Sequence, residues 1–165
     1  MPAVIRLEMN PKSFIAEYTA EDRPQIRFES NGEVGSKLVD RNAEFRRSVG
    51  KIAIESPTLA TDQLIRDLYD AETQHSKASF AVYHQFVMTL AQELLSRGGD
   101  DNYSCFLQCV MRAQDSYMSS QCVTLERPAA ESAIAYIDQQ IAETGDDAPK
   151  YYARVRGNIA RQIGG

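Results

Sequence analysis

The sequence predicts a mainly α-helical protein, in which residues 36–165 form a helical bundle and residues 1–35 form a small β-hairpin or extended arm. From Ser36 onward, apolar residues recur every three to four positions, the period of helices that bury one face. In the first thirty residues they alternate with polar residues, the period of half-buried strands. A chain of 165 residues with 43% hydrophobic and 25% charged residues has the balance of one compact globular unit.

The N-terminal segment contains two short alternating stretches, VIRLEM over residues 4–9 and PQIRFES over residues 24–30. The turn-forming sequences NPKS and TAEDRP lie between them. We expect either a hairpin or an extended arm that becomes ordered on a partner chain. The second option stays open because a few short strands bury little apolar surface alone.

Two helices are expected next. Ser36 can cap the first, and Gly50 would end it. Ser56 and Pro57 would begin a second helix of about forty residues, which stops at Gly98. Because this is long for a globular helix, we expect a break or kink near residues 76–79. The apolar face of the long helix includes Leu64, Ile65, Leu68, Tyr69, Phe86, Val87, Leu90 and Leu94.

Three further helices complete the expected bundle of about five. Asp101 or Asn102 would cap the third, the fourth begins near Pro128, and Asp147 with Pro149 opens the fifth. Each carries a single apolar stripe, and packing those stripes together is the simplest way to bury them. The stripe of the last helix contains Tyr152, Val155, Ile159 and Ile163.

Glu72 and His75 are the candidate metal ligands. They form an E-x-x-H on the apolar side of the long helix, so both side chains would point into the bundle. The pattern resembles the ferritin-like di-iron proteins, which implies a transition metal. Those proteins need a second such motif, and Ala81 precedes His84 at that spacing, so a symmetric homodimer would have to complete the site. The alternative is a packing role, in which an arginine or tyrosine faces Glu72.

The chain has three cysteines, Cys105, Cys109 and Cys122, without C-x-x-C spacing. Neither a disulfide framework nor a zinc ribbon is indicated. Cys105 and Cys109 are four residues apart and would share one side of a helix, so they are candidates for a redox or soft-metal pair. The alternative is that they are small buried apolar residues.

Charge is unevenly distributed. Residues 51–147 hold six basic and fifteen acidic residues, whereas residues 148–165 hold four basic and no acidic ones. The acidic middle argues against nucleic-acid binding, which needs a broad basic face. Lys150, Arg154 and Arg161 lie opposite the apolar stripe of the last helix. This surface is suited to contact an acidic protein partner or the acidic middle of a second copy of the chain. The alternative is a solvated helix face.

A second resemblance covers the C-terminal quarter. The sequence AYIDQQIAETGDDAPKYYARVRGNI, residues 135–159, is similar to the last two helices of phycobiliproteins. That resemblance implies a globin-like arrangement of helices. Phe80 stands roughly where those proteins carry the cysteine that binds a bilin.

No complete catalytic constellation is visible: there is no G-x-S-x-G and no glycine-rich phosphate loop. We therefore expect a non-enzymatic protein interaction module, such as a regulator, inhibitor, chaperone or assembly factor, without a cofactor. The alternative is a metal-binding protein or oxidoreductase that uses Glu72 and His75. A small-molecule pocket lined by tyrosines is a third option. Without a membrane span or a secretory signal, the expected compartment is the cytoplasm.

Overall fold

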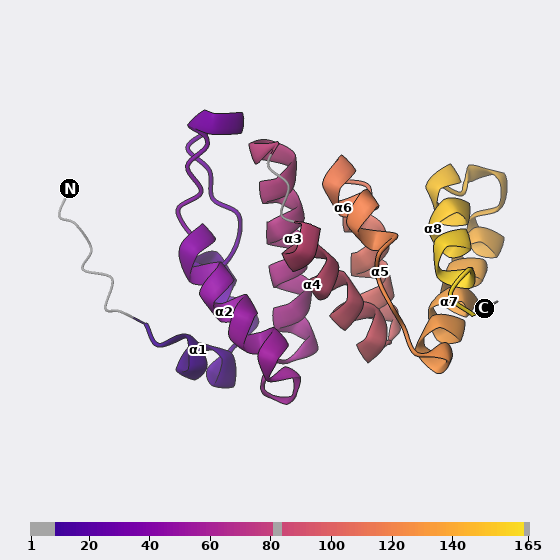
Figure 1. Ribbon diagram of the computed structural model, residues 1–165, viewed down its shortest axis with the longest axis horizontal. Coiled ribbons are helices and arrows are strands. Elements are labelled where there is room, and N and C mark those ends of the chain that lie inside the picture. Colours follow the sequence, from indigo (N-terminus) through magenta and orange to yellow (C-terminus); the bar gives the residue numbers. More distant parts are fainter. Residues whose placement is uncertain (1–8, 81–83, 164–165) are drawn as a thin grey trace.

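The computed structural model describes residues 9–80 and 84–163, which form a mainly helical structure. Figure 1 shows the helices succeeding one another along the long axis, with α1 (Pro11–Glu17) and α2 (Ala43–Glu55) at one end and α7 (Arg127–Thr144) and α8 (Lys150–Ala160) at the other. The predicted mainly helical class is confirmed. No helix among the described residues is both long and apolar enough to cross a membrane.

The N-terminal segment differs from the prediction. Residues 24–30 form no strand, and the segment contains the short 3-10 helix η1 (Ala20–Gln25) and a single antiparallel bridge between Ser30 and Asp40. Residues 4–8 of the other predicted strand lie outside the described residues, so the hairpin is not confirmed.

The expected turn NPKS instead begins α1. The side chain of Asn10 accepts a hydrogen bond from the backbone N–H of Lys12 at 2.9 Å, and Pro11 is the first helical residue. Phe14 packs edge-to-face on Phe45 of α2, with ring centroids 5.1 Å apart. The segment is therefore held against α2 by aromatic contacts rather than by strand pairing.

The first two predicted helix starts are wrong. A 3-10 turn, η2 (Gly35–Lys37), stands at Ser36, and α2 begins only at Ala43 and continues through Gly50. An added Cβ at Gly50 would stand 2.4 Å from Cζ of Phe86, so a larger residue there would require the Phe86 ring to move. Pro57 belongs to η3 (Pro57–Leu59), and Thr61 caps the following helix, α3 (Asp62–Ser79), by accepting a hydrogen bond from the N–H of Leu64.

The long predicted helix is two helices, with the break close to the expected position. Phe80 ends α3 in a left-handed conformation, with φ of 53°, and α4 (His84–Arg97) follows. The two pack against each other as an antiparallel pair, because Arg97 at the end of α4 contacts Asp62 at the start of α3.

The remaining helices follow the predicted order with different limits. The third is divided into α5 (Asp100–Cys109) and α6 (Gln114–Ser120), and Gly99, not Asp101 or Asn102, is the residue before α5. Pro128 lies in the first turn of α7, and Pro149 immediately precedes α8. α7 and α8 pack against each other as a second helical pair, and α7 packs against α4 and α5.

One hydrophobic core joins these elements. Its buried members come from α2, α3, α4, α5, α7 and α8, together with residues of the N-terminal segment. The largest fully buried apolar side chains in it are Tyr69, Phe106, Ile15, Ile26, Leu64, Ile65, Leu68, Leu90, Leu94, Leu95 and Ile137.

Candidate functional site

A buried cluster of charged side chains surrounds the predicted pair on α3. Both Glu72 and His75 are buried, and Arg46 of α2 is completely buried opposite them. The Nε of Arg46 lies 2.6 Å from Oε1 of Glu72, and its Nη2 lies 2.6 Å from Oδ2 of Asp40. Nδ1 of His75 lies 3.0 Å from the same oxygen of Asp40. The guanidinium of Arg46 therefore bridges the carboxylates of Glu72 and Asp40, and the imidazole of His75 contacts Asp40 as well.

The helical period of α2 and of α3 directs the side chains of the cluster toward the core. Glu72 and His75 lie three residues apart, so both project from one side of α3. Arg46 lies next to Phe45 and three residues before Val49, on the side of α2 that faces the core. Asp40 comes from the segment before α2, beside its bridge to Ser30.

Asp40 is charged in this environment. Burial raises the pKa of its carboxyl group, but hydrogen bonds from His75 and Arg46 outweigh burial and hold the pKa well below its ordinary value. The backbone N–H of Glu29 also donates to its Oδ1 at 3.3 Å. The carboxylate therefore ties the N-terminal segment to α2 and α3.

Cationic side chains surround Glu72, one of the two predicted metal ligands. Glu72 Oε1 is occupied by Arg46, and Arg47 Nε lies 3.6 Å away. Across residues 9–80 and 84–163, no three His, Cys, Asp or Glu side chains are grouped so that they could hold a metal ion. His84 is the first residue of α4, beyond the break.

The two predicted thiols share one side of α5. The Sγ of Cys105 donates to the carbonyl oxygen of Arg66 at 3.8 Å, and the Sγ of Cys109 donates to Oδ1 of Asp70 at 3.7 Å. Both line a polar cleft of about 330 Å³ between α3 and α5. Cys122 is exposed and separate, and all three cysteines are free thiols.

The predicted basic surface lies on α8. Lys150, Arg154 and Arg161 are exposed, and Arg161 donates a hydrogen bond to the side chain of Asn158. Arg156, which was not predicted as part of this surface, pairs with Asp138 of α7 and connects the two helices.

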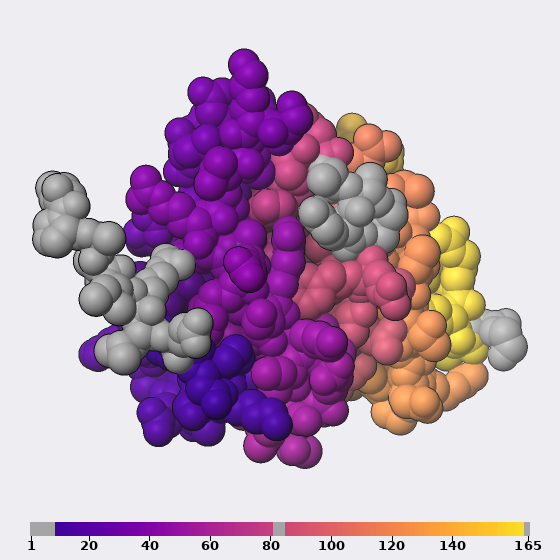
Figure 2. All heavy atoms as spheres, turned by 60° about the vertical axis from the view of Figure 1, so that its left-hand side comes forward, coloured from indigo at the N-terminus to yellow at the C-terminus, as the bar shows by residue number. Residues whose placement is uncertain are grey.

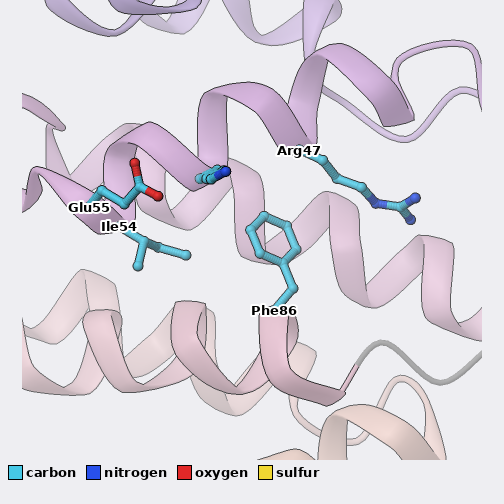
Figure 3. A pocket seen from close by; sticks show the side chains of 5 residues that line it. Arg47, Ile54, Glu55 and Phe86 are labelled. Carbon is cyan, nitrogen blue, oxygen red and sulfur yellow. The ribbon is translucent and has the colours of Figure 1, made fainter.

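A groove between α2 and α4 was not predicted. It has a volume of about 300 Å³ and is lined by Arg47, Lys51, Ile54, Glu55 and Phe86. Figure 3 shows Phe86 rising from α4 toward α2, with Arg47 on one side of it and Ile54 and Glu55 on the other. The groove walls are therefore apolar, with positive charge toward one end and negative charge at the other. In the space-filling view of Figure 2, the surfaces of α2 and α4 border each other on this face.

No family model, curated protein or solved structure matches this chain. The resemblances of residues 72–75 and 135–159 to known families therefore remain limited to those short segments.

Proposed function

We propose that this chain is a non-enzymatic protein interaction module that binds an acidic, amphipathic segment of a partner protein in the groove between α2 and α4. The observation that supports this most is the lining of the groove, where Ile54 and Phe86 lie beside the cations of Arg47 and Lys51. An apolar side chain of the partner would be desolvated against Ile54 and Phe86. A neighbouring carboxylate would pair with Lys51.

The charges of the groove would also fix the direction of the bound segment. Arg47 attracts a carboxylate at one end, whereas Glu55 repels it at the other. Lys51 lies between them on α2, about one helical turn from each. Electrostatic complementarity of this kind selects orientation and speeds encounter. The preferred ligand is therefore a segment whose acidic residues lie on one side of its apolar anchor.

The basic face of α8 is a second proposed contact surface. Lys150, Arg154 and Arg161 are exposed on a chain with a net charge of −5, so they are suited to guide an acidic partner. The proposed compartment is the cytoplasm, where the free thiols of Cys105, Cys109 and Cys122 would stay reduced.

Affinity capture with matched variants tests the proposal. Lys51→Glu and Ile54→Asp should each remove a bound protein that the unaltered chain retains, whereas Lys12→Glu should leave it bound. Lys12 is an exposed cation on α1, outside the groove, and provides the charge-matched control. The triple variant Lys150→Glu, Arg154→Glu, Arg161→Glu tests the α8 surface separately.

The outcomes are distinguishable. Loss through the groove variants alone assigns the interaction to the groove, and loss through the triple variant alone assigns it to α8. If both variants retained every captured protein, both proposed surfaces would be wrong. A second copy of the chain as the captured protein would identify a homodimer. Circular dichroism of each variant checks that the helices are intact.

A further inference from the structure

The polar cleft between α3 and α5 contains two neighbouring thiols. Cys109 is buried and Cys105 is partly exposed, and both line the cleft, so a small solute can reach the pair. Each thiol donates to an oxygen of α3, Cys105 to the carbonyl of Arg66 and Cys109 to Oδ1 of Asp70. The neighbouring Cys105 and the guanidinium of Arg112 lower the pKa of Cys109, and they outweigh burial and the carboxylate of Asp70, which raise it. Cys109 is therefore the thiol that loses its proton first.

A buried hydroxyl group at the contact of α3 with α5 has no partner among the described residues. Tyr69 of α3 is completely buried and stacks on Phe106 of α5, with ring centroids 6.2 Å apart. Its hydroxyl oxygen has no hydrogen-bond partner among the described residues. Burial raises the pKa of Tyr69, and the proximity of Cys109 and Cys105 raises it further. A neutral phenol is a hydrogen-bond donor, and a thiolate sulfur can accept from it.

The spacing of the thiols does not suit a disulfide. Residues four apart on a helix have Cβ atoms about 5–6 Å from each other. A disulfide needs a Cβ–Cβ distance of about 3.5–4.5 Å. Closing that bond would therefore require α5 to unwind. A metal ion between the sulfur atoms, with metal–sulfur distances of about 2.3 Å, spans the wider separation without moving the helix.

We propose that Cys105 and Cys109 form a two-coordinate site for a thiophilic monovalent cation of the copper(I) type. Soft thiolate ligands favour such ions. Structural zinc takes four ligands, and no third cysteine, histidine or carboxylate completes a metal-binding group with this pair in the described part of the chain. This site is independent of the proposed groove between α2 and α4.

Binding exchanges protons for the metal without a change of oxidation state. The S–H bonds of both thiols break, two sulfur–copper bonds form, and two protons leave to the solvent. Where Cys109 is already a thiolate, one proton leaves. The hydroxyl of Tyr69 would then donate to a thiolate sulfur and gain the partner that it lacks.

A competition titration tests the site. Copper(I) is presented to the reduced, full-length protein, under exclusion of oxygen, as its coloured complex with bathocuproine disulfonate. One equivalent should pass to the protein, with at least a 100-fold weaker transfer for Cys105→Ser and for Cys109→Ser. Cys122→Ser removes the exposed thiol and should leave the titration unchanged. Affinity should fall by a factor of about 10 to 100 for each unit by which the pH is lowered, one factor of ten for each displaced proton.

Several results would overturn the proposal. These are no transfer of copper, transfer that is lost in Cys122→Ser, or zinc bound by the same pair as tightly as copper(I). Tyr69→Phe keeps both thiols and the stacked ring, so it serves where a serine variant does not fold. Tyr69→Phe should bind copper(I) more weakly than the unaltered protein does. Equal affinity of the two would show that Tyr69 is not part of the site.

Discussion

Arg46 and Glu72 form an ion pair whose side chains are both completely buried, with Nε 2.6 Å from Oε1. Because an isolated charge is very costly in the core, the carboxylate predicted as a metal ligand needs this guanidinium. The same guanidinium reaches Asp40 and so fastens α2, α3 and the N-terminal segment together. At the polar interruption of the apolar face of α3, Glu72 therefore contacts a buried guanidinium of α2.

Arg46→Met should strongly destabilise the fold. It leaves Glu72 and Asp40 buried without their main counter-charge, and breaking a buried pair in this way costs about 3–5 kcal/mol. Arg154→Met, at an exposed position of α8, should change the free energy of unfolding by no more than about 0.5 kcal/mol. Urea denaturation of both variants measures the difference. Equal stabilities would mean that the buried pair contributes nothing.

Acid should weaken the contact of Asp40 with His75 and Arg46. Because the folded state holds the pKa of Asp40 below its unfolded value of about 3.9, its stabilisation is complete above that pH and is lost as the pH falls toward the folded pKa. Between the two pKa values, the contribution of Asp40 to the free energy of unfolding should fall by about 1.4 kcal/mol for each unit by which the pH is lowered.

Asp40→Asn should remove this part of the acid sensitivity, measured as urea unfolding at a series of pH values below about 5. Asp138→Asn provides the comparison, since Asp138 pairs with Arg156 but its side chain is 47% exposed. Solvent screens that pair, so its substitution should alter the pH dependence little. A steep slope that persists in Asp40→Asn would assign the acid sensitivity to other groups.

Arg97 should be hard to replace by lysine. Its Nη1 and Nη2 donate to the carbonyl oxygens of Ala60 and Pro57 at 2.7 Å and 2.6 Å, while its Nε donates to Glu93 at 2.8 Å. A lysine has a single nitrogen and cannot make this set of bonds. Arg97→Lys should cost about 1–3 kcal/mol, whereas Arg127→Lys, at a side chain that is 64% exposed, should cost much less. Thermal unfolding compares the two, and equal losses would contradict this role of Arg97.

Removing the hydroxyl of Tyr69 should stabilise the metal-free protein. That hydroxyl is buried without a partner in the part of the chain that the structure describes, so Tyr69→Phe should raise the free energy of unfolding by about 1 kcal/mol. Tyr151→Phe is the matched contrast, because its hydroxyl donates to the carbonyl oxygen of Leu107 at 2.9 Å. It should lower the free energy by about 1 kcal/mol. Destabilisation by Tyr69→Phe would show that its hydroxyl is already satisfied.

Periodicity predicted the helices well and their limits poorly. The apolar stripes of α3, α4, α7 and α8 were read correctly because burial imposes the helical period directly. The start of α1 was missed although Asn10 and Pro11 form a cap and a first helical residue. Alternation in residues 24–30 was misleading because the same pattern fits η1 and the irregular chain that follows it, in which Ile26 is buried in the core.

The site was predictable only in part. The spacing of Glu72 and His75 showed that both lie on one side of a helix, but Arg46 lies 26 residues away from Glu72 in the chain. One signal was available, since Arg46 stands on the apolar side of its own helix. The groove could not be predicted, because it depends on how closely Phe86 approaches Gly50, and that distance follows from tertiary packing.

Site-specific photo-cross-linking tests the proposed interaction most directly. A photoreactive residue replaces Lys51 at the groove, or Lys12 on α1 as the control, and the cross-linked peptides are identified by mass spectrometry in the cells that produce the protein. Position 51 should capture one partner through an acidic, amphipathic segment, and position 12 should not. Equal capture from both positions, or no capture from position 51, would contradict the account.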